Sequence, residues 1–178
     1  MNILLLTGSP HRHGTSALLA DEFTRGAQES GHTVTRFDAA FEDIHACIAC
    51  ERCHNTDKGC VFQDGMTKLN PLLMAADAVV FVSPIYYYDW SAQLKLAIDR
   101  FYANTEALCA SSKQAALLLT MADDTMESAA GAIQSFEGMT NYLGWQRRGV
   151  IAALACLDVE SMKQTDYPQK AYELGKTF

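Results

Sequence analysis

The sequence predicts an α/β fold in which helices cover both faces of a sheet of five parallel strands. The apolar runs at residues 2–7 and 78–82 are continuous rather than alternating, as expected of strands buried on both faces. Between such runs lie segments whose apolar residues recur at helical spacing. This alternation of strand and helix is typical of parallel sheets with helical crossovers.

The first β-α-β unit is expected over residues 2–37. Its first strand, 2–7, ends at the turn Gly8-Ser9-Pro10, and a helical pattern begins near Ser16. Gly31 marks the end of that helix before a short strand at 33–37. The unit therefore has about the length that a right-handed crossover requires.

The same alternation continues to the end of the chain. An irregular stretch, 39–65, is rich in cysteine, and the strand at 78–82 is expected to end in a turn at Ser83-Pro84. Since no repeat or linker divides the chain, we expect a single domain over residues 1–178 with 39–65 as an insertion. The remaining predicted elements are helices at 66–76, 91–102 and 125–143, strands at 115–120 and 149–155, and a helix after Pro168.

The charge balance disfavours two classes of partner. The 14 basic and 21 acidic side chains give a net charge of -7 without a basic patch, so we expect neither nucleic acid nor a membrane surface as a partner. No apolar run approaches the roughly 20 residues that are needed to cross a bilayer. Because no basic leader or apolar signal segment opens the chain, we expect a cytoplasmic protein with reduced thiols or a bound cluster.

Residues 8–16 join the first strand to the first helix with a composition that suits an anion. In parallel sheets of this kind, ligands bind outside the carboxyl ends of the strands, where the strand order reverses. The loop combines hydroxyls, histidines, an arginine and two glycines, and free N–H groups at the start of a helix stabilise a phosphate. An ordinary turn, in which Thr15 or Ser16 only caps the helix, is the alternative. Neither Gly-x-x-x-x-Gly-Lys-Ser/Thr nor Gly-x-Gly-x-x-Gly occurs, which argues against a P-loop NTPase.

Five short segments near the predicted strand ends carry a resemblance: Gly8-Ser9-Pro10, Gly14-Thr15-Ser16, Ser83-Pro84-Ile85-Tyr86, Ser91-Ala92-Gln93-Leu94-Lys95 and Asp99-Arg100. Together they resemble the NADPH-dependent FMN reductase and iron-sulfur flavoprotein family, from residue 1 to about 155. The resemblance implies a flavodoxin-like three-layer sandwich with strand order 2-1-3-4-5, FMN as cofactor and NAD(P)H as electron donor. It also implies a small-molecule electron acceptor and a homodimer or a dimer of dimers. Two positions depart from the family, because His11 stands where Arg is common and Tyr88 where a small residue is usual.

The resemblance and the residues together give a candidate FMN site. Aromatic side chains crowd the segment after the third strand, and an isoalloxazine ring needs flat apolar walls with N–H groups near its edge. Packing into the core or into a dimer interface is the alternative for these tyrosines. Asp123 and Asp124 are expected to face solvent, with Asp124 capping the next helix. The expected cofactor contacts are Ser9, His11, Gly14, Thr15, Ser16, Pro84, Ile85, Tyr86, Tyr87, Tyr88, Asp89, Thr120 and Ala122.

Four cysteines in the insertion form a candidate metal site. Their short intervals are typical of loops that wrap a [4Fe-4S] cluster, and they resemble the compact motif of iron-sulfur flavoproteins. Free thiols and a structural zinc held by all four cysteines are the alternatives. Outside the insertion, Cys109 and Cys156 are expected to be buried small apolar residues. The candidate metal ligands are Cys47, Cys50, Cys53 and Cys60.

Three functional hypotheses follow. The first is an FMN-dependent NAD(P)H oxidoreductase that reduces a quinone, a flavin or a similar small acceptor. The second is an iron-sulfur flavoprotein that transfers single electrons between a [4Fe-4S] cluster, FMN and a protein partner. The third is a flavin-less binding module of the same fold, which Tyr88 and the two acids after the fourth strand would favour.

Overall fold

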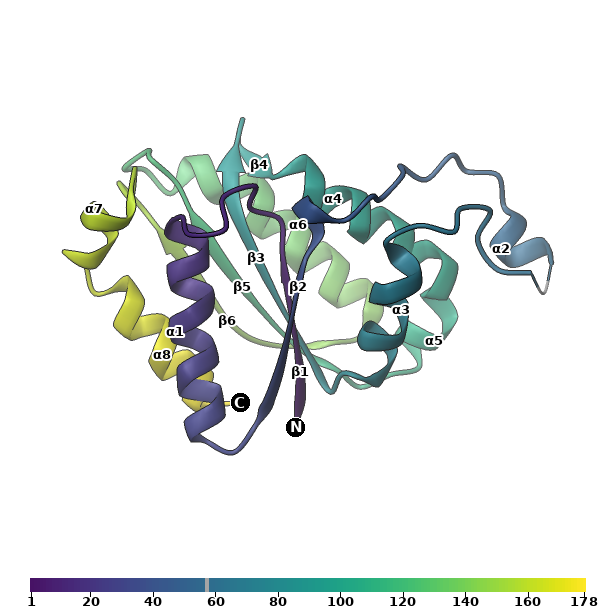
Figure 1. The fold of residues 1–178 in the computed structure, drawn as a ribbon, viewed down its shortest axis with the longest axis horizontal. Helices are drawn as coiled ribbons and strands as arrows, with labels where there is room; N and C mark the ends of the chain where they lie inside the picture. Colours follow the sequence, from purple (N-terminus) through teal and green to yellow (C-terminus); the bar gives the residue numbers. More distant parts are fainter. Residues whose placement is uncertain (57) are drawn as a thin grey trace.

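The central sheet contains five parallel strands and lies between two layers of helices (Figure 1). The computed structural model describes residues 1–56 and 58–178. Counted along the chain without the short antiparallel strand β4, the strand order is 2-1-3-4-5, so the expected flavodoxin-like order is confirmed. In spatial order the strands are β2 (Thr33–Asp38), β1 (Asn2–Thr7), β3 (Ala78–Tyr86), β5 (Gln114–Thr120) and β6 (Gln146–Ala153).

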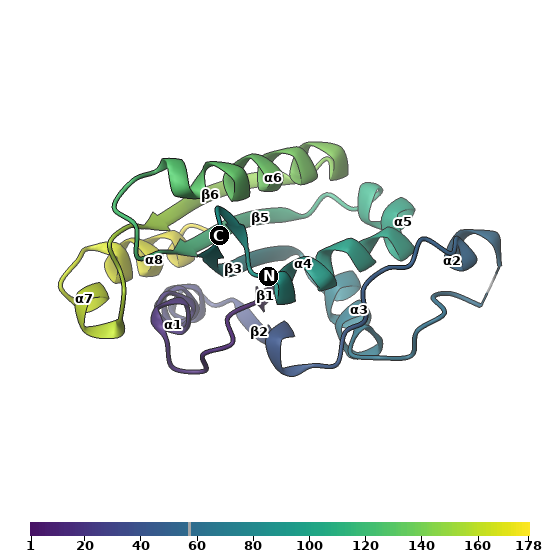
Figure 2. The same ribbon diagram turned by 90° about the horizontal axis from the view of Figure 1, so that it is seen from above.

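The helices divide between the two faces of the sheet, as Figure 2 shows from above. One face carries α1 (Thr15–Glu29), α7 (Val159–Lys163) and α8 (Tyr167–Lys176). The other carries α3 (Met66–Ala75), α4 (Ala92–Asp99), α5 (Thr105–Cys109) and α6 (Glu127–Leu143). Short 3-10 turns, η1 (Ala39–Phe41) and η2 (Arg100–Asn104), follow β2 and α4.

The continuous apolar runs of the sequence are explained by burial on both faces. In β1, Ile3 and Leu5 pack toward α1 and α8, whereas Leu4 and Leu6 pack toward α3 and α4. All four side chains are almost wholly buried. Burying each such side chain contributes about 1.5–3 kcal/mol, so this strand alone is a large part of the driving force for folding.

The largest differences from the expected strand boundaries are at the end of β3 and the start of β6. β3 continues through Ser83-Pro84 to Tyr86 and turns back there, because Ile85 pairs with Trp90 in a two-residue antiparallel strand, β4 (Asp89–Trp90). The expected turn at Ser83-Pro84 is therefore wrong, and the chain reverses two residues after it. β6 starts at Gln146 rather than 149, since the edge of a sheet accepts polar side chains that a central strand does not.

Two glycines let α1 and α8 pack backbone against backbone. A Cβ added at Gly26 would lie 2.0 Å from the carbonyl oxygen of Tyr172, and one added at Gly175 would lie 2.3 Å from that of Phe23. No side chain larger than hydrogen fits at these positions without moving a helix. The C-terminal helix α8 therefore packs directly on α1, whose first residues form part of the candidate phosphate site.

The insertion 39–65 projects from one end of the molecule, far from α7 (Figure 1). It contains η1 and the short helix α2 (Arg52–Asn55), and its residue 57 lies outside the described residues. Among the described helices, none is both long and apolar enough to cross a membrane.

Candidate functional site

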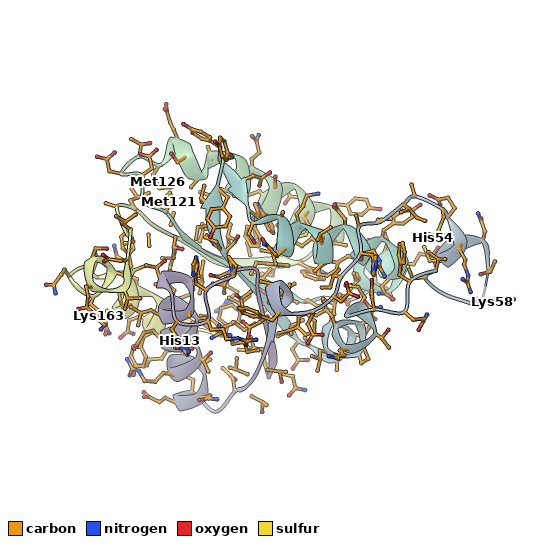
Figure 3. The ribbon with its side chains drawn as sticks, turned by 45° about the horizontal axis from the view of Figure 1, so that its top comes forward. His13, His54, Lys58, Met121, Met126 and Lys163 are labelled. Carbon is orange, nitrogen blue, oxygen red and sulfur yellow. The ribbon has the colours of Figure 1, made fainter. Side chains whose placement is uncertain are left out.

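A cleft of about 320 Å³ lies at the carboxyl edge of the sheet, where the loops after β1, β3, β5 and β6 meet. Figure 3 shows Met121, which lines the cleft, and His13 on one side of the molecule, and His54 and Lys58 of the insertion on the opposite side. Ten of the thirteen expected cofactor contacts line the cleft. These are Ser9, His11, Gly14, Thr15, Ser16, Pro84, Ile85, Tyr86, Thr120 and Ala122.

The loop between β1 and α1 presents the start of a helix to the cleft. Gly14 precedes α1 and provides no side-chain cap, and the first turn of the helix contains no acid. The loop is curled by Ser9, whose hydroxyl accepts a hydrogen bond from the backbone N–H of His11 at 3.2 Å. A Cβ at Gly14 would lie 3.0 Å from the Cβ of His11, so a larger residue there would require a small shift of the loop. An uncapped helix start with no negative charge favours an anionic ligand.

A buried hydroxyl pair fixes α1 to the sheet at the floor of the cleft. The Ser16 and Thr120 hydroxyl oxygens lie 2.8 Å apart, and both residues are buried. Ser16 therefore orients the helix start against the end of β5. Its backbone N–H belongs to the first turn of the helix, whose N–H groups have no partner within the helix.

Ser91 joins the loops that follow β1 and β3. Its hydroxyl donates to the carbonyl oxygen of Gly8 at 2.7 Å and accepts from the backbone N–H of Leu94 at 3.3 Å. Its own N–H donates to the Ser83 hydroxyl at 2.9 Å. Gly8 lets the serine come this close, because a Cβ at Gly8 would lie 2.3 Å from the Ser91 hydroxyl oxygen. One residue thus caps α4 and connects both sides of the cleft.

The tyrosines after β3 form the tip of a strained hairpin. Tyr87 and Tyr88 have φ angles of 48° and 68°, and both side chains are exposed, that of Tyr87 fully. The base of the hairpin is fixed, because the Trp90 indole donates to the carbonyl oxygen of Ala132 in α6 at 2.9 Å. Tyr86 lines the cleft, whereas Tyr87, Tyr88 and Asp89 do not. These three expected contacts therefore lie beside the cleft rather than in it.

We expect the double variant Tyr87→Asn/Tyr88→Gly to be more stable than the wild type by about 1–2 kcal/mol. Two-residue hairpin turns with positive φ at both positions favour Asn-Gly, and positive φ is costly for a bulky residue. For a chain of this size, thermal unfolding should shift upward by roughly 2–4 °C per kcal/mol. An unchanged or lower unfolding temperature would show that the tyrosine rings stabilise the turn by contacts that outweigh its strain.

Sequence reasoning missed three residues that line the cleft, namely Met121, Cys156 and Leu157. Met121 follows β5 directly, and the other two lie three and four residues after β6, so their place beyond the carboxyl ends of strands was the signal available. Cys156 is buried as expected, and burial raises the pKa of its thiol. The N-cap of α6 is Met126, whose side chain makes no capping hydrogen bond, so the expected cap by Asp124 is wrong. Asp123 instead accepts hydrogen bonds from the Thr125 N–H and the Ser128 hydroxyl in the turn before the helix. The Ser128 bond, followed by the Thr125 bond, lowers the pKa of Asp123.

The four cysteines of the insertion surround one small hollow. Burial raises the pKa of the Cys53 thiol, and the nearby Cys60 and Cys47 thiols raise it further. The backbone is left-handed at Ala49 and Glu51, so the chain bends sharply in each of the two intervals between the first three cysteines. Outside the insertion, Cys109 is exposed, because α5 ends there at the surface, so the expectation that it is buried is wrong.

A buried ion pair closes the neck of the insertion. Arg100 donates to both carboxylate oxygens of Asp64, at 2.8 and 3.3 Å, and the two side chains are only 3% and 2% exposed. Burial by itself would raise the pKa of Asp64, but the hydrogen bonds from Arg100 and from the N–H groups of His45 and Met66 lower it to about 2. Asp64 is therefore ionised at any physiological pH.

The ion pair predicts a loss of stability in acid. The pKa of Asp64 lies below its ordinary value of 3.8 in the folded chain, so the contribution is complete above about pH 4 and is lost as the pH falls through about 2. We expect the difference in unfolding free energy between the wild type and Asp64→Asn to shrink by about 2 kcal/mol between about pH 5 and pH 2. Urea unfolding of both proteins across this range checks it, and a constant difference would contradict it.

The profile of the NADPH-dependent FMN reductase family matches residues 1–147. The chain belongs to this family. Curated relatives of this FMN reductase family member include an iron-sulfur flavoprotein of Archaeoglobus fulgidus, 34% identical over 56% of this chain and 45% of that protein. Another is an iron-sulfur flavoprotein of Methanocaldococcus jannaschii, 30% identical over 56% of this chain and 51% of that protein. The chain spans about half the length of these relatives.

Solved structures with the same fold include oxidoreductases. An NAD(P)H:quinone oxidoreductase from Methanothermobacter marburgensis superposes with a TM-score of 0.73 at 19% identity, over 99% of this chain and 95% of that one. An FMN-dependent NADH-azoreductase from Bacillus anthracis superposes with a TM-score of 0.70 at 13% identity, over 99% of each chain. At these identities the likeness shows that the FMN reductase family member shares their fold.

The residues present fit both groups that the family and its relatives suggest. For FMN, the cleft places an uncapped helix start at one side and Pro84, Ile85 and Tyr86 at another. For a [4Fe-4S] cluster, four cysteines border one hollow, each free to bind a different iron. A single zinc fits less well, because in the described part of the chain no three His, Cys, Asp or Glu side chains gather around one point.

Proposed function

We propose that this protein binds FMN in the cleft at the carboxyl edge of the sheet and uses it to transfer electrons from NAD(P)H to a small acceptor such as a quinone or a flavin. The observation that carries the proposal is the junction of two unlike surfaces in one cleft. An anion-favouring helix start at residues 14–16 lies beside the largely apolar segment 84–86. FMN has a phosphate at one end and a flat ring at the other, so it matches both surfaces.

Each part of the cleft has a defined task in this proposal. The N–H groups at the start of α1 hold the phosphate, and the Ser16–Thr120 pair keeps that helix end in place. The segment from Pro84 to Tyr86 provides a wall for the ring, which supplies hydride and electron transfer when bound. Thr120 and Ala122 border the ring on the side of β5. The chain thus acts by binding and orienting its reactants.

The test begins with the absorbance spectrum of the purified protein, before and after addition of FMN or riboflavin. We expect bound FMN, weaker binding of riboflavin because it lacks the phosphate, and bleaching of the flavin band by NADPH or NADH under anaerobic conditions. A protein that stays colourless and gains no thermal stability from FMN would instead favour the flavin-less binding module. Flavin that binds but is not reduced by either nucleotide would contradict the oxidoreductase proposal.

A second candidate function is single-electron transfer through a [4Fe-4S] cluster on the insertion. The grouping of four cysteines around one hollow favours it, together with the iron-sulfur flavoproteins among the relatives. We expect anaerobically purified or reconstituted protein to contain about four iron and four sulfide per chain, as one such cluster requires. Replacement of Cys50 by Ser should lower both contents. Protein without iron or sulfide after reconstitution would leave the cysteines as free thiols.

A further inference from the structure

The two ends of the four-cysteine loop, defined here by its described residues 45–56 and 58–64, are joined directly. The N–H of His45 donates to Asp64 at 3.0 Å, and Arg100 donates to the His45 carbonyl oxygen at 2.8 Å. One step further out, the N–H of Gly65 donates to the carbonyl oxygen of Asp43 at 2.7 Å. A Cβ at Gly65 would meet this neighbouring segment at 2.9 Å, so the absence of a side chain allows the close approach. Arg100 and Asp64 therefore stand at the neck of the loop.

Aromatic and cysteine side chains surround the same guanidinium. The ring of Phe62 lies 5.2 Å from Arg100 on one side and stacks on His45, with ring centroids 4.8 Å apart. Burial would lower the pKa of Arg100, but its contacts with Asp64 and with the nearby Cys60 raise it above the ordinary value. Arg100 therefore stays charged, and its charge is balanced by the ionised carboxylate of Asp64.

The chain just after Arg100 holds the outer part of the loop. The Tyr102 hydroxyl donates to the Glu51 carboxylate at 2.8 Å, and the Tyr102 carbonyl oxygen lies 2.9 Å from His54 Nε2. Tyr102 also lines the hollow that the cysteines border. The 3-10 turn η2 therefore contacts the loop at its neck and again on both sides of its third cysteine, Cys53.

Stability alone does not account for the buried pair. Replacing a buried ion pair by apolar side chains of similar size is often neutral or stabilising, whereas breaking it by removing one partner costs about 3–5 kcal/mol. What an apolar pair cannot reproduce is the set of bonds to the N–H and carbonyl of His45, two residues before the first cysteine. Those bonds restrict the loop, and restricting a ligand loop in advance lowers the entropic cost of binding.

We propose that Arg100, together with Asp64, is a positioning residue that holds the four-cysteine loop closed before any metal binds. The closure does not rest on the proposed cluster. If the cluster is bound, a loop that is already closed should retain its iron better, because less of the chain has to be ordered on binding.

Loop closure is tested on metal-free protein with trypsin, which cuts after Arg52 and Lys58 in the loop. The test variant, Asp64→Leu/Arg100→Met, removes the bonds without leaving a buried charge unpaired. The matched control, Lys95→Met/Asp99→Leu, removes an exposed pair of α4 whose charged atoms lie 2.6 Å apart. We expect cleavage in the loop at least about tenfold faster in the test variant, at an unchanged midpoint of urea unfolding, and an unchanged rate in the control. Equal rates in wild type and test variant would overturn the closure.

The consequence for the cluster is tested by reconstitution with ferrous iron and sulfide. We expect Asp64→Leu/Arg100→Met to lose iron to a chelator several times faster than the wild type and the Lys95→Met/Asp99→Leu control. Equal iron retention in all three proteins would overturn this consequence. Wild-type protein that takes up no iron would refute the cluster, while the trypsin result would still decide the closure.

Discussion

Replacing Thr15 by Glu is expected to weaken FMN binding by about a hundredfold or more, while the ligand-free protein becomes slightly more stable. Thr15 opens α1 and lines the cleft, and the first turn of this helix contains no acid. In the absence of ligand, a carboxylate there would stabilise the folded protein by about 0.3–1 kcal/mol, because it is attracted to the positive end of the helix dipole. With FMN bound, the carboxylate would face the phosphate, and bringing two like charges together costs several kcal/mol. A loss of about 2.7 kcal/mol in binding free energy already weakens affinity a hundredfold.

The control is Thr15→Gln, because glutamine has nearly the same shape as glutamate but carries no charge. We expect it to bind FMN far better than Thr15→Glu, and riboflavin to bind the two variants almost equally. Fluorescence titration of both flavins, together with urea unfolding of the free proteins, separates charge from shape. Should Thr15→Glu bind FMN as well as Thr15→Gln does, the phosphate would have to lie elsewhere.

Replacing Gly26 by Ala is expected to cost about 2 kcal/mol of unfolding free energy. In a helix interior, alanine is ordinarily more stabilising than glycine by roughly 1 kcal/mol. The stability change expected for Gly26→Ala therefore has the opposite sign to the one that helix propensity predicts. The reason is the 2.0 Å separation between the added Cβ and the carbonyl oxygen of Tyr172, a backbone atom that can move only with α8. Overpacking of this kind typically costs about 1–3 kcal/mol.

The same substitution at Gly138 supplies a matched control. Gly138 lies in α6, and a Cβ added there would meet nothing within 4 Å. We therefore expect Gly138→Ala to raise stability by about 0.5–1 kcal/mol. Chemical denaturation of both variants is sufficient as a measurement. If the two variants shift in the same direction, the contact between α1 and α8 is looser than the distances indicate.

The central strands could be predicted from the sequence because both of their faces are buried. The runs at 2–7 and 78–82 are apolar throughout, which leaves no ambiguity of face or period. The hairpin at 85–90 could not be found in this way, because its turn consists of two tyrosines in place of the expected Asn, Asp or Gly. Its strand pairing depends on contacts with α6, far along the chain. The polar start of β6 was hidden for a related reason, since an edge strand needs little apolar surface.

The candidate site was predictable as far as composition marks it. The loop 8–16 and the aromatic segment after β3 stand out in the sequence, and most of their named residues do line the cleft. The direction in which each tyrosine side chain points could not be predicted, because it depends on the geometry of the turn. Tyr86 lines the cleft, whereas Tyr87, the next residue, is fully exposed. The hydroxyl pair of Ser16 and Thr120 was equally out of reach, since 104 residues separate its members. The role of Arg100 at the cysteine loop likewise requires tertiary contacts.

The serine that bridges Gly8 and Ser83 makes the two sides of the cleft mechanically interdependent. Ordering either loop restricts the other. The first ligand to bind therefore meets part of the conformational entropy cost of ordering both loops, and the second ligand binds without that part. Inorganic phosphate and a phosphate-free flavin should consequently assist each other's binding, and by linkage the assistance must be equal in both directions. Replacing Ser91 by Ala should weaken this mutual assistance more than it weakens either affinity alone, because the remaining link between the two loops is the bond from the Gly8 N–H to the Val82 carbonyl oxygen at 2.9 Å and the pairing of β1 with β3.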